Sequence, residues 1–164
     1  MLSKRLQDAL NQQINHELYS SYLYLAMSAH FESVNLPGFA RWMKVQSEEE
    51  NEHGMKFFHY VYERGGKVVL EAIAKPPADY KTTIDVMKKV LEHEKKVTGT
   101  IEALYELALK EKDYAAQVML HWFIKEQVEE EKNATDIIEM LKTIGDAPAG
   151  LAMLDSRVGA RAKG

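Results

Sequence analysis

The sequence predicts an all-α fold: four long helices form a bundle, a long crossover joins the second helix to the third, and a short fifth helix follows. Three observations predict this fold. Apolar residues recur at helical spacing in four long segments. The stretch 65–82 has no helical period. Each long segment also places one glutamate within its apolar stripe, and a bundle lets four such stripes face one another.

The first two helices have clear start and stop signals. Ser3 can cap a helix whose apolar positions keep helical spacing from Leu6 to Phe31, until the sequence Asn-Leu-Pro-Gly at 35–38 breaks it. The proline of that break suits the first turn of a second helix, which should run to Arg64. Two glycines follow, and glycine commonly ends a helix.

Residues 65–82 are expected to form extended chain. Loops of this length are uncommon inside a compact domain, so this one needs a reason. Eighteen residues can span at most about 59 Å, whereas a helix of roughly 28 residues is about 42 Å long. The stretch can therefore run the whole length of the bundle as a crossover.

Two further long helices and a short one complete the chain. Thr82 or the next residue can cap a third helix that continues to about Lys110. Asp113 can cap a fourth helix, which should stop at Gly145, and Pro148 then starts a short fifth helix. The length of 164 residues suits one domain, 1–164.

The first candidate for function is the acidic stretch 47–53. Within it, Glu50 and His53 stand three residues apart, on one helix face, a spacing that suits two ligands of one metal centre. Acidic runs usually mark a solvated helix face. The residues that share the phase of Glu50, seven and eleven positions away, are all apolar: Phe39, Met43, Phe57 and Val61. A buried carboxylate needs a cation or titrates neutral, and a bound metal is the most effective cation.

The same pattern recurs in the other three long segments, at Glu17, Glu94 and Glu130. Unpaired glutamates are rare in protein cores, so four in matching phase are not expected by chance. If the crossover returns the chain to the end where the second helix began, all four lie about 17 to 25 Å from that end. The sequence therefore predicts that the four carboxylates meet at one level.

Composition and charge exclude several classes of protein. Lys and Arg number 21 against 25 Asp and Glu, and the net charge of −4 gives no basic field for nucleic acid or polybasic signal for lipid. The chain has no cysteine, which excludes a disulfide scaffold and a thiolate metal site. Neither a signal sequence nor an apolar run of membrane length is present, so we expect a soluble, cytoplasmic protein.

These residues give the chain, over essentially its whole length, a resemblance to the bacterial-type non-haem ferritins. Di-iron carboxylate bundles commonly take single glutamates from two helices and Glu-x-x-His from the other two. Here the fourth helix has Gln127 and Glu130 in that motif, and glutamine at this place is a ferritin feature. Bacterioferritins carry histidine where this chain has Glu130 and a haem-ligating methionine where it has Asn51, so the resemblance implies no haem.

The resemblance implies a ferritin-like bundle with a dinuclear iron centre, in which Glu50 bridges two ions. One iron would be bound by Glu17, Glu50 and His53, and the other by Glu50, Glu94 and Glu130. Gln127 would form a hydrogen bond that orients a ligand or a water molecule. Tyr24 would be a hydrogen-bond donor or a one-electron source beside the centre, or else a core tyrosine with a satisfied hydroxyl. For Trp122 we expect plain core packing, and for the other five histidines surface or interface positions: His16, His30, His59, His93 and His121.

A second acidic group flanks the first. Animal ferritins lack the full cluster of Glu49, Glu126, Glu129 and Glu130, which this chain has. The resemblance to bacterial ferritins implies a third iron bound there, with Glu130 shared between the two centres. The alternative is three solvated glutamates on the surface of a cavity.

The resemblance also implies function and assembly. The chain would oxidise Fe(II) to Fe(III) with O2 or hydrogen peroxide, as a ferroxidase, and store ferric oxyhydroxide inside a hollow shell of 24 subunits. The fifth helix, about 147–160, would line a fourfold axis. A di-iron peroxidase or oxidase without mineral storage is the alternative function, and a binding or scaffold bundle without redox chemistry is a more distant one.

Two surface features bear on this assembly. Tyr22, Leu23 and Tyr62 lie outside the core stripe, and uncovered apolar surface predicts a homo-oligomer. The positions at which animal ferritins place the carboxylates of the threefold channel are Gln117 and Leu120 here. The usual access route for iron is therefore not expected.

Overall fold

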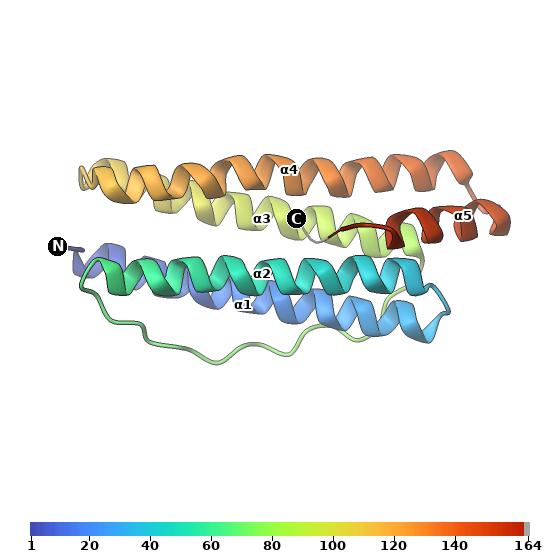
Figure 1. The fold of residues 1–164 in the computed structure, drawn as a ribbon, viewed down its shortest axis with the longest axis horizontal. Helices are drawn as coiled ribbons and strands as arrows, with labels where there is room; N and C mark the ends of the chain where they lie inside the picture. Colours follow the sequence, from blue (N-terminus) through green and yellow to red (C-terminus); the bar gives the residue numbers. More distant parts are fainter. Residues whose placement is uncertain (163–164) are drawn as a thin grey trace.

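The computed structural model describes residues 1–162 and contains five helices. They are α1 (Lys4–Ser33), α2 (Pro37–Glu63), α3 (Thr83–Lys110), α4 (Tyr114–Ile144) and α5 (Pro148–Gly159). The four long helices lie side by side in an elongated bundle, and α5 packs at one end of it (Figure 1). This confirms the predicted fold class and places each helix end within about a residue or two of the predicted one.

Side chains cap three of the long helices as predicted. The Ser3 hydroxyl accepts a hydrogen bond from the amide of Leu6, at 3.0 Å. Thr82 and Asp85 form a reciprocal capping box at the start of α3. The Asp113 carboxylate accepts from the amide of Ala116 at 3.0 Å and so caps α4. These side chains satisfy amide groups that the first turn of a helix leaves unpaired.

The α2 helix is capped from outside, by α5. Leu36, its N-cap residue, has an apolar side chain that cannot accept a hydrogen bond. The carboxylate of Asp155 in α5 accepts from the amides of Gly38 and Phe39 instead, at 3.1 and 2.9 Å. A Cβ atom on Gly159 would lie only 2.6 Å from the Cα of Gly38, so glycine permits this close helix crossing. The short fifth helix is thus part of the subunit core.

The crossover after α2 runs along the outside of α1 and α2 for the length of the bundle (Figure 1). Its backbone is bound by polar side chains of α1. Gln7 accepts from the amide of Lys67 at 2.8 Å, and Asn11 and Asn15 donate to carbonyls of the crossover at 3.0 to 3.4 Å. The chain therefore begins α3 at the end where α2 began, which confirms the predicted crossover.

The interior of the bundle consists of two apolar clusters with a polar layer between them. One cluster lies toward α5 and includes Phe31, Phe39 and Met87. The other includes Leu6 and Phe57 at the opposite end. In every long helix, the glutamate singled out above falls, along the sequence, between residues of one cluster and residues of the other. The four glutamates therefore occupy a common level of the bundle.

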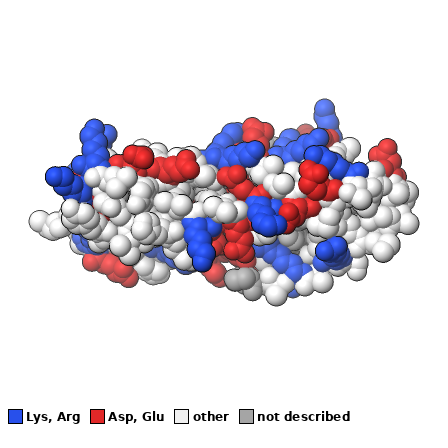
Figure 2. All heavy atoms as spheres, turned by 90° about the horizontal axis from the view of Figure 1, so that it is seen from above, with Lys and Arg blue, Asp and Glu red and all other residues white. Residues whose placement is uncertain are grey.

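The surface carries charges of both signs, interspersed with uncharged regions on the face seen in Figure 2. Tyr22 and Tyr62 are about half exposed, at 48% and 52%, as predicted. Leu23 is only 6% exposed, so its predicted exposure was wrong: it belongs to the same core cluster as Trp42 of α2. Within the described residues, none of the helices is both long enough and apolar enough to span a membrane.

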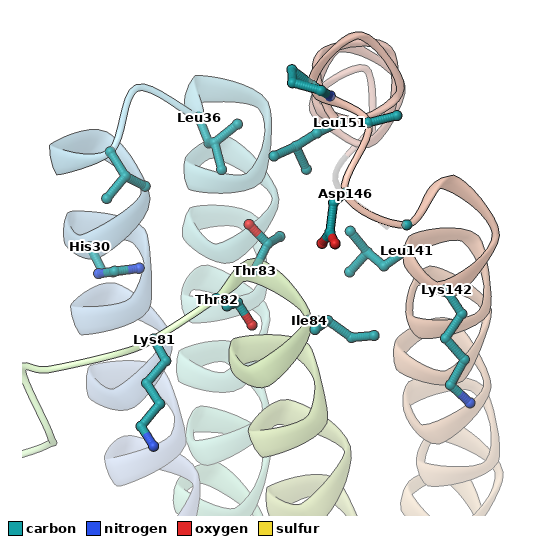
Figure 3. Close-up of a pocket in the computed structure, with 14 residues that line it drawn as sticks. His30, Leu36, Lys81, Thr82, Thr83, Ile84, Leu141, Lys142, Asp146 and Leu151 are labelled. Carbon is teal, nitrogen blue, oxygen red and sulfur yellow. The ribbon is translucent and has the colours of Figure 1, made fainter.

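A cavity of about 600 Å³ opens at the end of the bundle where α5 begins. Leu141 of α4 and Leu151 of α5 point into it, and the start of α3 forms a further wall (Figure 3). It lies at the helix ends, whereas the buried glutamates lie near the middle of each helix. This cavity is therefore separate from the candidate site.

Candidate metal centre

Four buried carboxylates meet in the polar layer, one from each long helix. Glu17, Glu50, Glu94 and Glu130 are between 0% and 4% exposed. Glutamate at such depth is unusual, because the charged form loses its hydration on burial. The phase argument from the sequence therefore placed all four side chains in the interior correctly.

Glu17, Glu50 and His53 form the tightest group. Each offers a ligand atom, and these atoms all lie within 4.8 Å of one another. Gln13 donates to Oε1 of Glu17 at 2.8 Å, and Nδ1 of His53 lies 3.3 Å from Oε2 of Glu50. When both carboxyls are ionised, Oε2 of Glu17 and Oε1 of Glu50 are buried without a hydrogen-bond donor among residues 1–162. A protonated Glu50 can donate to Glu17, so the pair needs either a proton or a metal ion.

Glu94 and Glu130 approach from the other two helices and have different partners. The Tyr24 hydroxyl donates to Glu94 in a short hydrogen bond, and Nε2 of Gln127 donates to Oε2 of the same carboxylate at 3.1 Å. Gln46 donates to Oε2 of Glu130 at 2.9 Å. Tyr24 and Gln127 thus lie beside the carboxylates, as the family resemblance implied.

Gln13 and Gln46 were not predicted from the sequence. Each is at most 1% exposed, and each lies four residues before a buried glutamate of its own helix, Gln13 before Glu17 and Gln46 before Glu50. That spacing puts amide and carboxylate on one helix face. A glutamine at this offset was the signal that could have identified both.

Burial and mutual repulsion make the carboxylates hold protons. Burial raises the pKa of Glu94 to about 7, against the hydrogen bonds from Tyr24 and Gln127. Burial, followed by the charge of Glu94, raises the pKa of Glu130 to about 8. The pKa of Glu50 is raised well above its ordinary value, first by burial and then by the charges of Glu94 and Glu17. In the metal-free protein, several protons therefore occupy the centre at neutral pH, where divalent cations can replace them.

His53 is suited to bind metal as a neutral ligand. Burial lowers its pKa to about 4, and the positive charge of Lys56 contributes to the shift. The imidazole is therefore uncharged at neutral pH, with a lone pair available for a metal ion. Its ring meets those of Trp122 and Phe123 edge-on, at centroid distances of 5.2 and 6.1 Å, and these contacts fix its plane.

The second acidic group surrounds a cavity of about 420 Å³ between α2 and α4, beside His53. Glu49, Glu126, Glu129 and Glu130 all line it. Glu49 is buried and forms an ion pair with Arg161, Glu126 is partly exposed, and Glu129 is exposed. Burial raises the pKa of Glu126, and the neighbouring charge of Glu129 raises it further. The structure thus brings the four residues to one water-accessible space that borders the buried centre.

Trp122 differs from its prediction. It is 38% exposed and lines this cavity, with Nζ of Lys56 3.1 Å above the ring, so it is not a plain core residue. His93, predicted at the surface or an interface, is half-buried: its Nε2 lies 2.7 Å from the Ser20 hydroxyl, and its ring meets Tyr24 edge-on.

Neither position of the animal threefold channel offers a carboxylate. Gln117 donates to the carbonyl of Ala108 at 3.3 Å, and Leu120 is completely buried in the bundle. Leu120 therefore cannot line a channel at the surface of the subunit.

Four buried carboxylates from four helices, together with one neutral histidine, define a carboxylate-rich metal centre in a helical bundle. A family profile described as a ferritin-like domain matches residues 7–144. The chain is 43% identical over 161 residues to a bacterial non-heme ferritin of Bacteroides fragilis, covering 98% of this chain and 100% of that one. The corresponding identity to a bacterial non-heme ferritin of Staphylococcus aureus is 38%, covering 98% and 97%.

Solved structures agree with these sequence matches. An open pore ferritin from the hyperthermophilic archaeon Archaeoglobus fulgidus matches with a TM-score of 0.97 and 45% identity, covering 99% of this chain and 100% of that one. The chain belongs to the ferritin family. Its function is iron storage with a ferroxidase centre, which confirms the family and the activity expected from the sequence.

Proposed function

We propose that the buried centre binds two Fe(II) ions as substrates, with Glu50 as the bridging ligand. Glu17, Glu50 and His53 bind one ion, and Glu50, Glu94 and Glu130 bind the other. The observation that supports this assignment best is the pair of buried oxygens, Oε2 of Glu17 and Oε1 of Glu50, that lack a donor when ionised. Buried oxygens of this kind need either protons or a cation, and a divalent cation can take the place of the protons.

The reaction removes one electron from each of two Fe(II) ions and passes both to one O2 molecule. With two protons, the products are two Fe(III) ions and one hydrogen peroxide molecule. Hydrogen peroxide can take two further electrons from two more Fe(II) ions, with two protons, and yield two water molecules. The oxygen-rich ligand set binds the harder Fe(III) more tightly than Fe(II) and so favours oxidation.

The surrounding polar residues orient the ligands. Gln127 and Tyr24 donate to Glu94, and Gln46 donates to Glu130, so each of these carboxylates is held in a fixed position. Tyr24 is also placed to supply one electron, because its hydroxyl can pass its proton to Glu94 when the ring is oxidised. Gln13 holds Glu17 in the same manner.

A third iron binds at Glu49, Glu126 and Glu129, with Glu130 shared between this accessory site and the buried pair. Support comes from the 420 Å³ cavity that all four line, and from the position of His53 and Glu130 on its wall. Because Glu129 is exposed and Glu126 partly so, this iron is more hydrated and less tightly bound than the pair.

The single domain, 1–164, assembles into a shell of 24 copies in the cytoplasm and stores ferric oxyhydroxide inside. Exposed apolar side chains support assembly, with Val118 and Val128 of α4 both 70% exposed. The α5 helix borders a fourfold axis in this shell.

The experiment that tests the centre is anaerobic addition of Fe(II) followed by rapid mixing with O2, with Fe(III) recorded optically. The amplitude of the fast phase should rise with added iron and saturate at two Fe(II) per subunit. Saturation at one, or a fast phase that survives in Glu50→Ala, would refute a pair bridged by Glu50.

A further inference from the structure

The segment that follows α5, residues 160–162, approaches the metal centre. From the end of the bundle, α5 runs back beside α2 and α4, and residues 160–162 continue toward the middle of the bundle (Figure 1). Arg41 of α2 anchors this segment: its Nε donates to the carbonyl of Gly159 at 2.9 Å, and its Nη2 to the carbonyl of Arg161 at 3.1 Å. The backbone at Arg161 is thus fixed to α2, a few turns from Glu49.

The Arg161 side chain lines the cavity of about 420 Å³ between α2 and α4, which we call the accessory cavity. Its Nη2 donates to Oε2 of Glu49 at 2.5 Å, and its guanidinium lies over the ring of Trp42, 4.8 Å from the centroid. The side chains of the ion pair are only 17% and 10% exposed, so solvent screens the pair weakly. The positive charge also favours the ionised form of Glu130 and lowers the pKa of that carboxyl, although burial and Glu94 raise it overall.

The guanidinium is not fully satisfied in this position. Its Nη1 is buried without a hydrogen-bond partner among residues 1–162. A structural arginine normally uses its planar fork of donors in full, and a buried donor left unpaired is unfavourable. Arg161 therefore acts mainly through its charge, from the wall of the cavity that the four accessory carboxylates also line.

We propose that Arg161 is the resident cation of the accessory site: its guanidinium balances Glu49 in the metal-free subunit and leaves it when a divalent ion binds. This proposal rests on the accessory site proposed above and adds what regulates its occupancy. The guanidinium and a divalent ion cannot both lie against Glu49 without strong repulsion. Metal binding must therefore displace the arginine, and this competition weakens the site.

The geometry permits this displacement. Arg161 lies two residues beyond Gly159, the last residue of α5, so its side chain can leave Glu49 and turn toward solvent without moving a helix. Arg41 binds only backbone carbonyls and continues to hold the segment. Competition then makes the third iron the last to bind and the first to leave, while the buried pair, on which the guanidinium acts only through the pKa of Glu130, changes less.

The test is calorimetric titration of the assembled, metal-free protein with Zn²⁺, a divalent ion that cannot be oxidised. Arg161→Gln should bind the third Zn²⁺ about tenfold more tightly than the wild type, because a partly buried, charge-assisted ion pair no longer competes. The affinity for the first two Zn²⁺ ions should change much less, because Arg161 acts on the buried pair only through the pKa of Glu130. Arg157→Gln is the matched control: it removes the same charge from an exposed position in α5 and should behave as wild type.

Two additional variants exclude a merely structural effect. In a Glu49→Gln background, Arg161→Gln should give no gain, because the arginine has lost its partner. Arg161→Lys retains the charge but loses the fork and the stacking on Trp42, so it should bind the third ion about threefold more tightly. If light scattering shows that Arg161→Gln does not assemble, Arg161→Lys takes its place in the comparison with the wild type.

An unchanged or weaker third site in an assembled Arg161 variant would overturn the proposal and leave the accessory site standing. If no variant binds more than two Zn²⁺ per subunit, both the resident cation and the accessory site are refuted. The dinuclear centre is judged separately, because its fast oxidation of two Fe(II) per subunit does not depend on either.

Discussion

Replacing Glu50 with glutamine tests whether the buried carboxylates serve metal binding at the expense of the metal-free fold. Glu50 is 1% exposed, and burial and the charges of Glu94 and Glu17 raise its pKa well above the ordinary value. Glutamine has the same size without the charge, and its amide can donate to the free oxygen of Glu17. Replacement of buried ion pairs by neutral residues of similar volume is often neutral or stabilising by about 1–4 kcal/mol, and here the change also removes the repulsion of Glu50 by Glu94 and Glu17.

The sign of the pH dependence follows from the raised pKa. A carboxyl whose pKa is raised in the folded state binds more protons in that state than in the unfolded state. The stability of the wild type therefore falls as the pH rises from the unfolded-state pKa through the folded-state pKa. Below the raised pKa, Glu50 is protonated in the folded protein, and the two proteins should have nearly equal stability. The advantage of Glu50→Gln should grow as the pH rises and the wild-type carboxyl loses its proton.

Calorimetry of the metal-free proteins measures the stability, and stopped-flow oxidation of Fe(II) measures the activity. The variant should melt higher at alkaline pH but lose roughly 100-fold or more in the fast phase, since changes in groups that only support metal ligands already cost about 10–100-fold. Glu63→Gln, an exposed change near the end of α2, is the control for charge. A lower melting temperature at every pH, or oxidation at the wild-type rate, would refute the reasoning.

Four further changes test other parts of the structure. Zn²⁺ binding to the buried pair should weaken as the pH falls from about 8 to about 6, because the pKa values of Glu94 and Glu130 are about 7 and about 8 and both carboxyls must release protons. Calorimetric titrations in two buffers count the released protons, and a pH-independent affinity would contradict the prediction. Gln46→Leu should slow stopped-flow oxidation about tenfold by leaving Glu130 without its donor, and an unchanged rate would exclude a positioning role. Glu129→Ala should keep the fast phase but alter the number of Fe(II) oxidised per O2 in an oxygen electrode, since the third iron can supply an electron; a constant ratio would favour a solvated glutamate. Asp155→Ala should cost about 1–2 kcal/mol through the lost cap of α2, and calorimetry should show a melting temperature lower by several degrees, whereas an equal one would mean that water replaces the cap.

Much of the fold could be predicted because its signals are local. The caps Ser3 and Asp113 act within one turn, and helical phase alone placed Glu17 and the other three glutamates in the interior. The crossover was predictable from its length, since eighteen residues without helical period can span the bundle. Its attachment to Asn11 and Asn15 was not, because polar residues on a helix face are usually solvated.

The errors arise where two helices decide jointly what is buried. Leu23 lies outside the core stripe of α1, yet it is covered because it packs in one cluster with residues of α2. Trp122 precedes Phe123 by one residue, about 100° around α4, so it faces the accessory cavity and not the core. Asp155 and Arg161 act on α2 from the far end of the chain, more than one hundred residues away. No periodic pattern encodes such contacts.

The central claim is that four helices together hold two irons bridged by Glu50, and anomalous diffraction at the iron edge tests it most directly. Crystals loaded anaerobically with Fe(II) should show two peaks in every subunit, one against Glu17 and His53 and the other against Glu94 and Glu130, with Glu50 between them. A single iron in the buried layer, or iron only in the cavity lined by Glu126 and Glu129, would contradict it.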